Sequence, residues 1–198
     1  MNVKILEKST CYQGFFKLIR YRLKHSLFRG GWSDEVLREV LERGQAVAVL
    51  PYDPILEQVV LIEQFRPGAI DYPEGAWLWE IVAGIIEVGE QTERVAYRET
   101  EEETGCQLSN IIHINDFFVS PGSTSETTTL FCGKVDASEA SGIHGVVAEH
   151  EDIKVHVISL DAALDMVTNN KIHFVPAIVA LQWLALHREE VKAKWTFG

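Results

Sequence analysis

Apolar and polar residues alternate through the first part of the chain, over residues 4–12 and again over residues 15–28. A period of two is typical of β-strands, and Gln13-Gly14 between these stretches predicts a turn. We therefore expect two or more antiparallel strands here. Because a two-stranded piece is only marginally stable alone, its apolar face should be buried against the rest of the chain or against a second copy.

The pattern changes after Gly30-Gly31, which end the alternating segment. The charged run over residues 32–44 is interpreted as a connector. Short apolar runs bounded by Pro and Gly then predict strands over residues 46–50, 59–64, 79–82, 111–118, 127–135 and 153–158. Helical spacing predicts helices over residues 92–104, 160–167 and 176–187. This order predicts a layered α/β domain with a mixed sheet at residues 45–198, preceded by a small N-terminal antiparallel β segment at residues 1–44.

Composition narrows the class of partner. The 198 residues include 29 Asp and Glu against 18 Lys and Arg, which gives a net charge of −11, and 46% of them are hydrophobic. This apolar content suffices for a packed core, but no apolar run approaches the roughly 20 residues that cross a bilayer. The acidic balance argues against nucleic-acid binding, which depends on Lys and Arg. We expect no membrane partner and no nucleic-acid partner.

The N-terminus shows no signal-peptide pattern. Three scattered cysteines, Cys11, Cys106 and Cys132, are too few for a disulfide framework and are interpreted as buried thiols. Both observations predict a cytoplasmic location.

Acidic residues are concentrated between Gly84 and Cys106, where seven Glu face two Arg. On the expected helix, Glu99, Glu102 and Glu103 are spaced i, i+3 and i+4, so their carboxylates project from one face and repel one another. Mg²⁺ would relieve this repulsion, since it is held by a few carboxylates together with substrate phosphate. A solvated acidic helix face is the alternative for such a run.

The spacing around the run favours the metal. It resembles the Nudix box, and every fixed glycine and charged position of that motif is filled: Gly84, Glu90, Arg98, Glu99, Glu102, Glu103 and Gly105. Thr100 stands where the motif has an aliphatic residue, which affects only how the helix packs. Cys106 fills the last apolar position.

The resemblance continues outside the box. Trp79-Glu80, the loop 120–126 and the stretch 145–156 are similar to the bacterial ADP-ribose pyrophosphatase subfamily of Nudix hydrolases. This resemblance implies a Nudix α/β/α sandwich that hydrolyses the pyrophosphate bond of ADP-ribose to AMP and ribose 5-phosphate. It also implies two or three Mg²⁺ ions, with Mn²⁺ as a substitute.

The resemblance assigns roles to residues around the box. It implies metal ligands at the carbonyl of Ala83 and at Glu99, Glu102, Glu103 and Glu151. Glu149 would position or deprotonate the attacking water, with Glu102 as a second catalytic carboxylate. Glu90 and Arg98 would form an ion pair that orients the loop and helix beside Gly84. Because residues two apart in an extended segment point the same way, Glu149 and Glu151 should face one site; an acidic surface loop is the alternative.

Substrate contacts follow from the same resemblance. Arg66 would bind phosphate and Glu126 the terminal ribose, while Arg38 and Phe15 would reach adenine from the partner subunit of a homodimer. A solvent-facing arginine and a packed core phenylalanine are the alternatives for the last two.

Two other functions stay open. Related Nudix enzymes hydrolyse GDP-mannose or other nucleoside diphosphate sugars with the same box. A non-hydrolysing ADP-ribose sensor is the third possibility, although such domains typically lose box carboxylates that this chain keeps.

Overall fold

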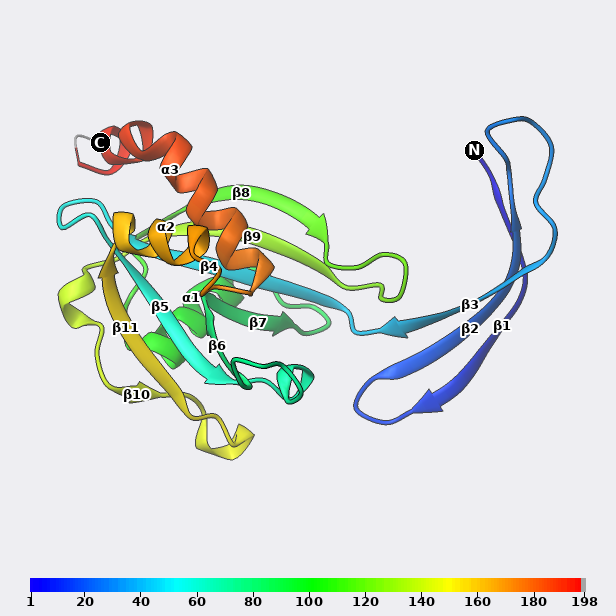
Figure 1. Ribbon diagram of the computed structural model, residues 1–198, viewed down its shortest axis with the longest axis horizontal. Helices are drawn as coiled ribbons and strands as arrows, with labels where there is room; N and C mark the ends of the chain where they lie inside the picture. Colours follow the sequence, from blue (N-terminus) through cyan, green and yellow to red (C-terminus); the bar gives the residue numbers. More distant parts are fainter. Residues whose placement is uncertain (197–198) are drawn as a thin grey trace. The chain divides into compact units, whose positions relative to one another are not determined.

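The computed structural model describes residues 1–196 (Figure 1). They form two compact units: the first combines residues 1–45 with 117–128, and the second combines residues 46–116 with the chain from residue 129 onward. The sequence pattern did not indicate that the segment 117–128 belongs with the N-terminal strands.

The first unit contains an antiparallel sheet of three strands in the order β1 (Val3–Gln13), β2 (Lys17–His25) and β3 (Val36–Glu42). The two expected strands and the turn after Gln13 are confirmed. The expected connector at residues 32–44 is wrong, because residues 36–42 form β3. Its charged side chains pair across the sheet instead of marking a loop, as Arg20 Nη2 and Glu39 Oε1 lie 2.7 Å apart.

The two faces of this sheet differ in polarity. On one face Arg22 contacts the carboxylates of Glu7 and Glu35, each at 3.3 Å. Alternation along the strands places apolar side chains on the opposite face. There Val3 and Ile5 keep 65% and 58% of their surface exposed. This face is therefore an apolar surface that the first unit does not bury by itself.

The cysteines are distributed between the two units. Cys106 and Cys132 are buried, as expected, but Cys11 is exposed. The expectation for Cys11 is wrong because it lies on β1, an edge strand of a sheet that is largely exposed on both faces.

The second unit is built on an eight-stranded mixed sheet. The order along the main path is β10 (Ile143–His144), β11 (Ile153–Ser159), β5 (Gln58–Phe65), β4 (Gln45–Asp53), β9 (Thr127–Lys134) and β8 (Asn110–Phe118). β6 (Trp77–Glu80) pairs with β5, and β7 (Val82–Ile86) pairs with β4. The single strand expected at residues 79–82 is thus two strands on different neighbours, separated at Ile81.

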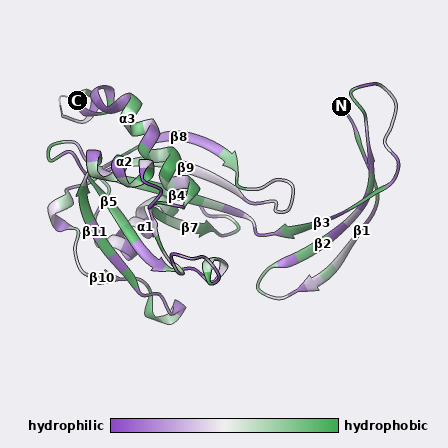
Figure 2. Ribbon diagram, viewed as in Figure 1, coloured by the Kyte–Doolittle hydropathy of each residue, from purple (hydrophilic) through white to green (hydrophobic). Residues whose placement is uncertain are grey.

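The apolar runs of β4 and β5 form the centre of this sheet, where the side chains of residues 47–50 and 59–62 are fully buried. Figure 2 shows β5 turning from hydrophobic to hydrophilic toward its end. This polar end leads into Arg66 and the short 3-10 turn η1 (Pro67–Ala69), so the strand delivers charged side chains to one edge of the unit.

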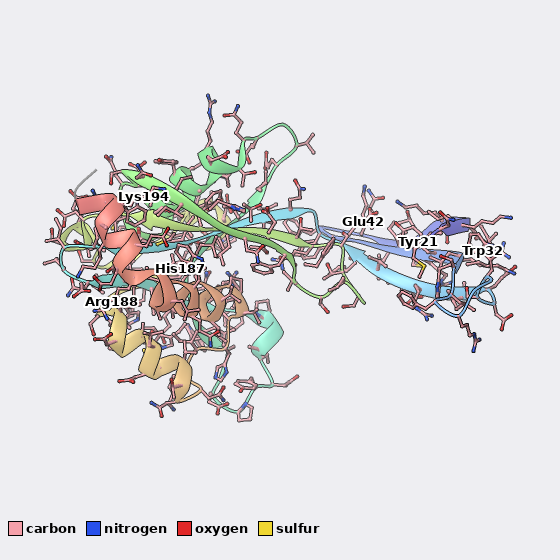
Figure 3. The ribbon with its side chains drawn as sticks, turned by 90° about the horizontal axis from the view of Figure 1, so that it is seen from above. Tyr21, Trp32, Glu42, His187, Arg188 and Lys194 are labelled. Atoms are coloured by element: carbon pink, nitrogen blue, oxygen red, sulfur yellow. The ribbon has the colours of Figure 1, made fainter. Side chains whose placement is uncertain are left out.

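Three helices cover the sheet: α1 (Thr92–Thr104), α2 (Leu160–Thr168) and α3 (Val175–Thr196). α1 lies on one side and α2 and α3 on the other (Figure 3), which gives the α/β/α layers of the expected sandwich. α1 has the bounds that the sequence predicted, and it ends at Gly105, which adopts a left-handed conformation (φ 73°). None of the helices in residues 1–196 is long and apolar enough to span a membrane.

α3 continues well beyond the expected end at residue 187. The charged segment after His187 remains helical because its ion pairs and apolar residues both bind it to the unit. Arg188 Nε lies 2.6 Å from Glu57 Oε1, and Lys192 Nζ lies 3.0 Å from the same oxygen. Figure 3 shows Arg188 and Lys194 along this part of the helix.

Candidate active site

Helix α1 lies against strand β7, and this packing brings the Nudix-like residues together. The buried carboxylate of Glu103 accepts a hydrogen bond from the backbone N–H of Ala83 at 3.1 Å. Glu99, one turn earlier, lies directly over Gly84, since a Cβ added to Gly84 would overlap with Glu99 Oε1. The glycine therefore provides the space that the Glu99 carboxylate occupies.

Burial dominates the electrostatics of these two carboxylates. It raises the pKa of Glu99 to about 7 and raises the pKa of Glu103 well above its ordinary value. Glu151 adds to both upward shifts, and Glu102 adds to that of Glu99, while Arg98 and Arg66 oppose them. Crowded, partly desolvated carboxylates are the donor set that a hard divalent cation prefers, so these residues fit Mg²⁺.

Arg98 lies among the acidic residues of α1. Its Nη1 is 3.0 Å from Glu99 Oε1 and 2.9 Å from Glu102 Oε2, whereas its Nη2 is 3.8 Å from Glu90 Oε1. The structure thus brings the expected Arg98 and Glu90 together, but the contact is longer than those to Glu99 and Glu102. Within residues 1–196, no three His, Cys, Asp or Glu side chains already stand as a metal-ligand group. The Arg98 guanidinium supplies the positive charge between Glu99 and Glu102.

Thr100, which departs from the Nudix pattern, is fully buried in α1. Its hydroxyl donates to the backbone carbonyl of Ala96 at 2.7 Å. The departure is therefore accommodated inside the helix, because the polar group is satisfied within one turn.

Arg66, at the end of β5, forms a two-point ion pair with Glu80 on β6. Its Nε donates to Oε1 at 2.9 Å and its Nη2 donates to Oε2 at 2.8 Å. The Glu80 side chain is 1% exposed and that of Arg66 is 37% exposed. Glu80 was part of the resemblance found in the sequence, but no role was assigned to it. The signal that could have indicated a role was a carboxylate within an apolar strand.

The loop with Glu149 and Glu151 is joined to α1, because the N–H of Gly145 donates to the carbonyl of Glu102 at 3.2 Å. The expectation that this loop is extended is wrong. Residues 147–149 form a 3-10 turn, η3 (Val147–Glu149), and His150 has a φ of 59°.

The two loop carboxylates lie in different surroundings. Glu151 is half-buried, accepts a hydrogen bond from the N–H of Val146 at 2.9 Å, and lies close enough to Glu99 and Glu103 to raise their pKa values. Glu149 is exposed on the turn. Of the two loop carboxylates, Glu151 is therefore the one whose charge acts on the α1 carboxylates.

In the first unit, Glu126 is 9% exposed and pairs with Arg43, whose Nη1 lies 3.1 and 2.9 Å from its two carboxylate oxygens. The Arg43 guanidinium also lies over the ring of Phe16, 5.4 Å from its centroid. The backbone of Leu41 holds the loop before Glu126, since it donates to the Ser123 carbonyl at 2.9 Å and accepts from Ser125 N–H at 3.0 Å. Sequence reasoning missed Arg43, which lies 83 residues from its partner.

Phe15 and Arg38 lie in different surroundings on the first unit. Phe15 stands in the β1–β2 turn with 88% of its surface exposed, so it is not a packed core residue. Arg38 lines a cavity of about 380 Å³ on the apolar face of the sheet, together with Val3, Ile5, Tyr21, Leu23, Val40, Pro121 and Gly122. Its Nη1 donates to the Leu37 carbonyl at 2.7 Å.

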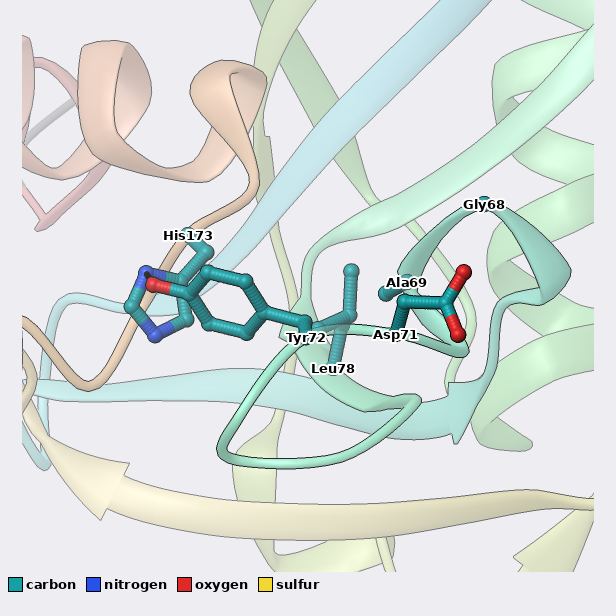
Figure 4. A pocket seen from close by; sticks show the side chains of 6 residues that line it. All are labelled: Gly68, Ala69, Asp71, Tyr72, Leu78 and His173. Carbon is teal, nitrogen blue, oxygen red and sulfur yellow. Dashed lines mark hydrogen bonds between the residues drawn. The ribbon is translucent and has the colours of Figure 1, made fainter.

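A second cavity, of about 340 Å³, lies in the second unit (Figure 4) and is lined by Gly68, Ala69, Asp71, Tyr72, Leu78 and His173. The Tyr72 hydroxyl is 3.5 Å from His173 Nδ1, and the two rings meet edge to face. In Figure 4 the Asp71 carboxylate points away from this pair. None of the expected site residues lines this cavity.

Comparisons with known proteins agree with this geometry. A family model described as "NUDIX domain" matches residues 42–178. The chain is 48% identical over 194 residues to an ADP-ribose pyrophosphatase of Escherichia coli strain K12, covering 98% of this chain and 93% of the relative. It is 45% identical to an ADP-ribose pyrophosphatase of Haemophilus influenzae, covering 98% of this chain and 91% of the relative.

More distant proteins extend the comparison. A GDP-mannose pyrophosphatase of Yersinia pestis is 30% identical over 190 residues, with 94% of each chain covered. A solved structure described as an ADP compounds hydrolase superimposes with a TM-score of 0.73 at 18% identity, covering 98% of this chain and 97% of the other. At that identity the likeness concerns the fold.

Proposed function

The chain belongs to the Nudix family and is a pyrophosphohydrolase, and we propose that its reaction is hydrolysis of ADP-ribose to AMP and ribose 5-phosphate. The observation that carries this proposal is the pair Glu99 and Glu103, two crowded carboxylates beside Gly84 and Ala83 in a chain 48% identical to an ADP-ribose pyrophosphatase. Retention of these carboxylates favours hydrolysis over a sensor that only binds ADP-ribose.

Nudix pyrophosphatases generally use divalent metal ions. We propose two or three Mg²⁺ here, with Mn²⁺ as a substitute, held by Glu99, Glu102, Glu103, Glu151 and the carbonyl of Ala83. Such ions supply charge neutralisation of the diphosphate and activation of the attacking water. The closeness of Glu151 to Glu99 and Glu103 supports its place in this set.

The chain's own residues would complete the reaction. Arg66 would bind a diphosphate oxygen through the donors that its contact with Glu80 leaves free. Glu149 would accept the proton of the attacking water, and its exposed place on a turn leaves it free to move when substrate binds. Glu126 would contact the terminal ribose from the loop held by Leu41.

We also propose a homodimer in which Arg38 and Phe15 reach the partner's adenine. The apolar face of the three-stranded sheet supports this, because its exposed residues and its cavity of about 380 Å³ remain to be covered. A cytoplasmic location is consistent with the free thiols of Cys106 and Cys132.

The test is a substrate panel of ADP-ribose and GDP-mannose with Mg²⁺, with Mg²⁺ replaced by EDTA as control, and with the nucleoside monophosphate product quantified by chromatography. We expect AMP from ADP-ribose at the highest kcat/KM and none with EDTA. The 30% identical GDP-mannose pyrophosphatases make GDP-mannose the second candidate. A higher kcat/KM for GDP-mannose would transfer the assignment to it, and binding of ADP-ribose without product would indicate a sensor.

A further inference from the structure

Glu80 is a carboxylate in the interior of the second unit. Its side chain is 1% exposed, and ionised carboxylates are almost never buried to this degree without a partner. The partner is Arg66, which donates to both carboxylate oxygens, at 2.9 and 2.8 Å. Gln64 Nε2 also lies 3.5 Å from Glu80 Oε2. A two-point contact of this kind fixes both the position and the plane of the guanidinium.

The contact leaves most of the Arg66 donors available. A guanidinium has five N–H groups, and Glu80 accepts from two of them. Arg66 keeps 37% of its side chain exposed, and it is close enough to Glu103 and Glu151 for their charges to act on it. The Arg66 guanidinium is therefore in the neighbourhood of the carboxylates that the metal would join.

The same closeness creates a competition. An arginine without Glu80 would have Glu103 and Glu151 as alternative partners, and pairing with them would remove both a phosphate-binding cation and two carboxylate donors from the site. The buried Glu80 gives Arg66 a stronger, geometrically matched partner on the side away from solvent.

We infer that Glu80 is a positioning residue that holds Arg66 ready for a diphosphate and keeps it from pairing with Glu103. This inference rests on the proposed function, because it assigns the diphosphate of the substrate to the free donors of Arg66.

The first test is Glu80→Gln, which keeps the size of the side chain but removes its charge. We expect the KM for ADP-ribose to rise about 10- to 100-fold, the usual cost of losing a supporting partner, with kcat changed less. Glu63→Gln is the matched control: Glu63 is on the neighbouring strand β5, alternates to the face opposite Gln64, and contacts His156 at 2.9 Å. The control should keep the wild-type KM, and an unchanged KM in Glu80→Gln would overturn the inference.

A double-mutant cycle separates positioning from a structural role. If Glu80 acts through Arg66, adding Glu80→Gln to Arg66→Ala should cause no further rise in KM. Effects that add in full would contradict the inference. If Glu80→Gln does not fold, Glu80→Asp serves instead, because it keeps the charge but draws the carboxylate back by one methylene. A wild-type KM in that variant would also contradict it.

Calorimetric titration with inorganic pyrophosphate and Mg²⁺ gives a readout without turnover. We expect the Kd for pyrophosphate to be at least about 10-fold higher in Glu80→Gln than in wild type. An equal Kd would overturn the inference. If wild type binds pyrophosphate but does not hydrolyse ADP-ribose, the proposed function fails, whereas weaker pyrophosphate binding in Glu80→Gln would still support the positioning role.

Discussion

The carboxylate of Glu103 accepts a hydrogen bond from the backbone N–H of Ala83 at 3.1 Å, which joins the last turn of α1 to the start of β7. One buried side chain therefore fastens a helix to a strand, and under the proposed function it would also provide a charge for the metal. A neutral amide can fasten the helix but cannot provide the charge.

Glu103→Gln should accordingly lower Mg²⁺-dependent activity by at least about 100-fold, since loss of a supporting residue alone costs about 10- to 100-fold. Stability to urea should be equal or higher, because burial raises the pKa of Glu103 and so disfavours its charged form. Glu101→Gln, an exposed position of the same helix, is the control and should keep full activity. Full activity of Glu103→Gln would exclude the metal assignment, as would activity that EDTA does not reduce.

Gly84→Ala tests the space beneath Glu99. The added Cβ would overlap with Oε1 and Cγ of Glu99, so the Glu99 side chain must move aside. We expect an activity loss of about 10- to 100-fold with a higher Mg²⁺ requirement, and a nearly unchanged melting temperature. Gly68→Ala is the control, because its added Cβ has no atom within 4 Å. Equal activities of the two variants would show that the position of Glu99 is unimportant.

Substitutions of Glu149 and Glu151 should affect different kinetic parameters. Glu149→Gln should lower kcat by roughly 10² to 10⁴ with little change in KM, as expected for a positioned base. Glu151→Gln should instead raise the Mg²⁺ concentration at half-maximal rate. Steady-state kinetics over a Mg²⁺ series measures both. The reverse result would exchange the roles, and if neither matters, Glu126→Gln is the next variant to test.

The homodimer is tested by sedimentation at micromolar concentration. We expect a dimer, because the apolar face with Val3 and Ile5 is largely exposed in the single chain. Arg38→Ala should raise the KM for ADP-ribose without dissociating the dimer. An active monomer would contradict both parts of this prediction, whereas a dimer with an unchanged KM would remove only the contribution to the partner's site.

The ion pairs of α3 should contribute to the pH dependence of the free energy of unfolding. Hydrogen bonds from Arg188 and then Lys192 lower the pKa of Glu57, so its contribution is present above the ordinary Glu pKa and is lost as the pH falls through the folded-state value. Glu57→Gln should lower the free energy of unfolding at pH 7 by about 0.5–1 kcal/mol, since these side chains are partly exposed. Urea denaturation should show this difference disappearing in acid. The exposed Glu190→Gln on the same helix should show none.

The sequence pattern was sufficient where each residue's environment depends on its neighbours along the chain. The apolar runs predicted β4 and β5, and the box spacing predicted that Glu99 and Glu103 share a helix face. It failed where partners come from other strands. β3 looked like a charged connector because its Glu39 finds Arg20 only across the sheet.

In the site, too, the residues that were not predicted are those whose contacts are distant in the sequence. Glu80 and Arg43 were not predicted as supporting residues because each is explained by one partner on another element, 14 and 83 residues away. The 3-10 turn that carries Glu149 was also missed, because the left-handed conformation of His150 has no signature in the hydrophobic pattern.

The attachment of residues 117–128 to the N-terminal strands limits how this protein can be dissected. The chain passes between the two units at three points, so the N-terminal strands are not a modular appendage that truncation could remove cleanly. A protein shortened to begin at residue 46 would keep Glu126 but lose Arg43, its partner at 2.9 Å, and would lose the Leu41 backbone that holds the preceding loop. Transplanting the second unit onto a different N-terminal module would therefore require the loop 120–126 to be redesigned with it.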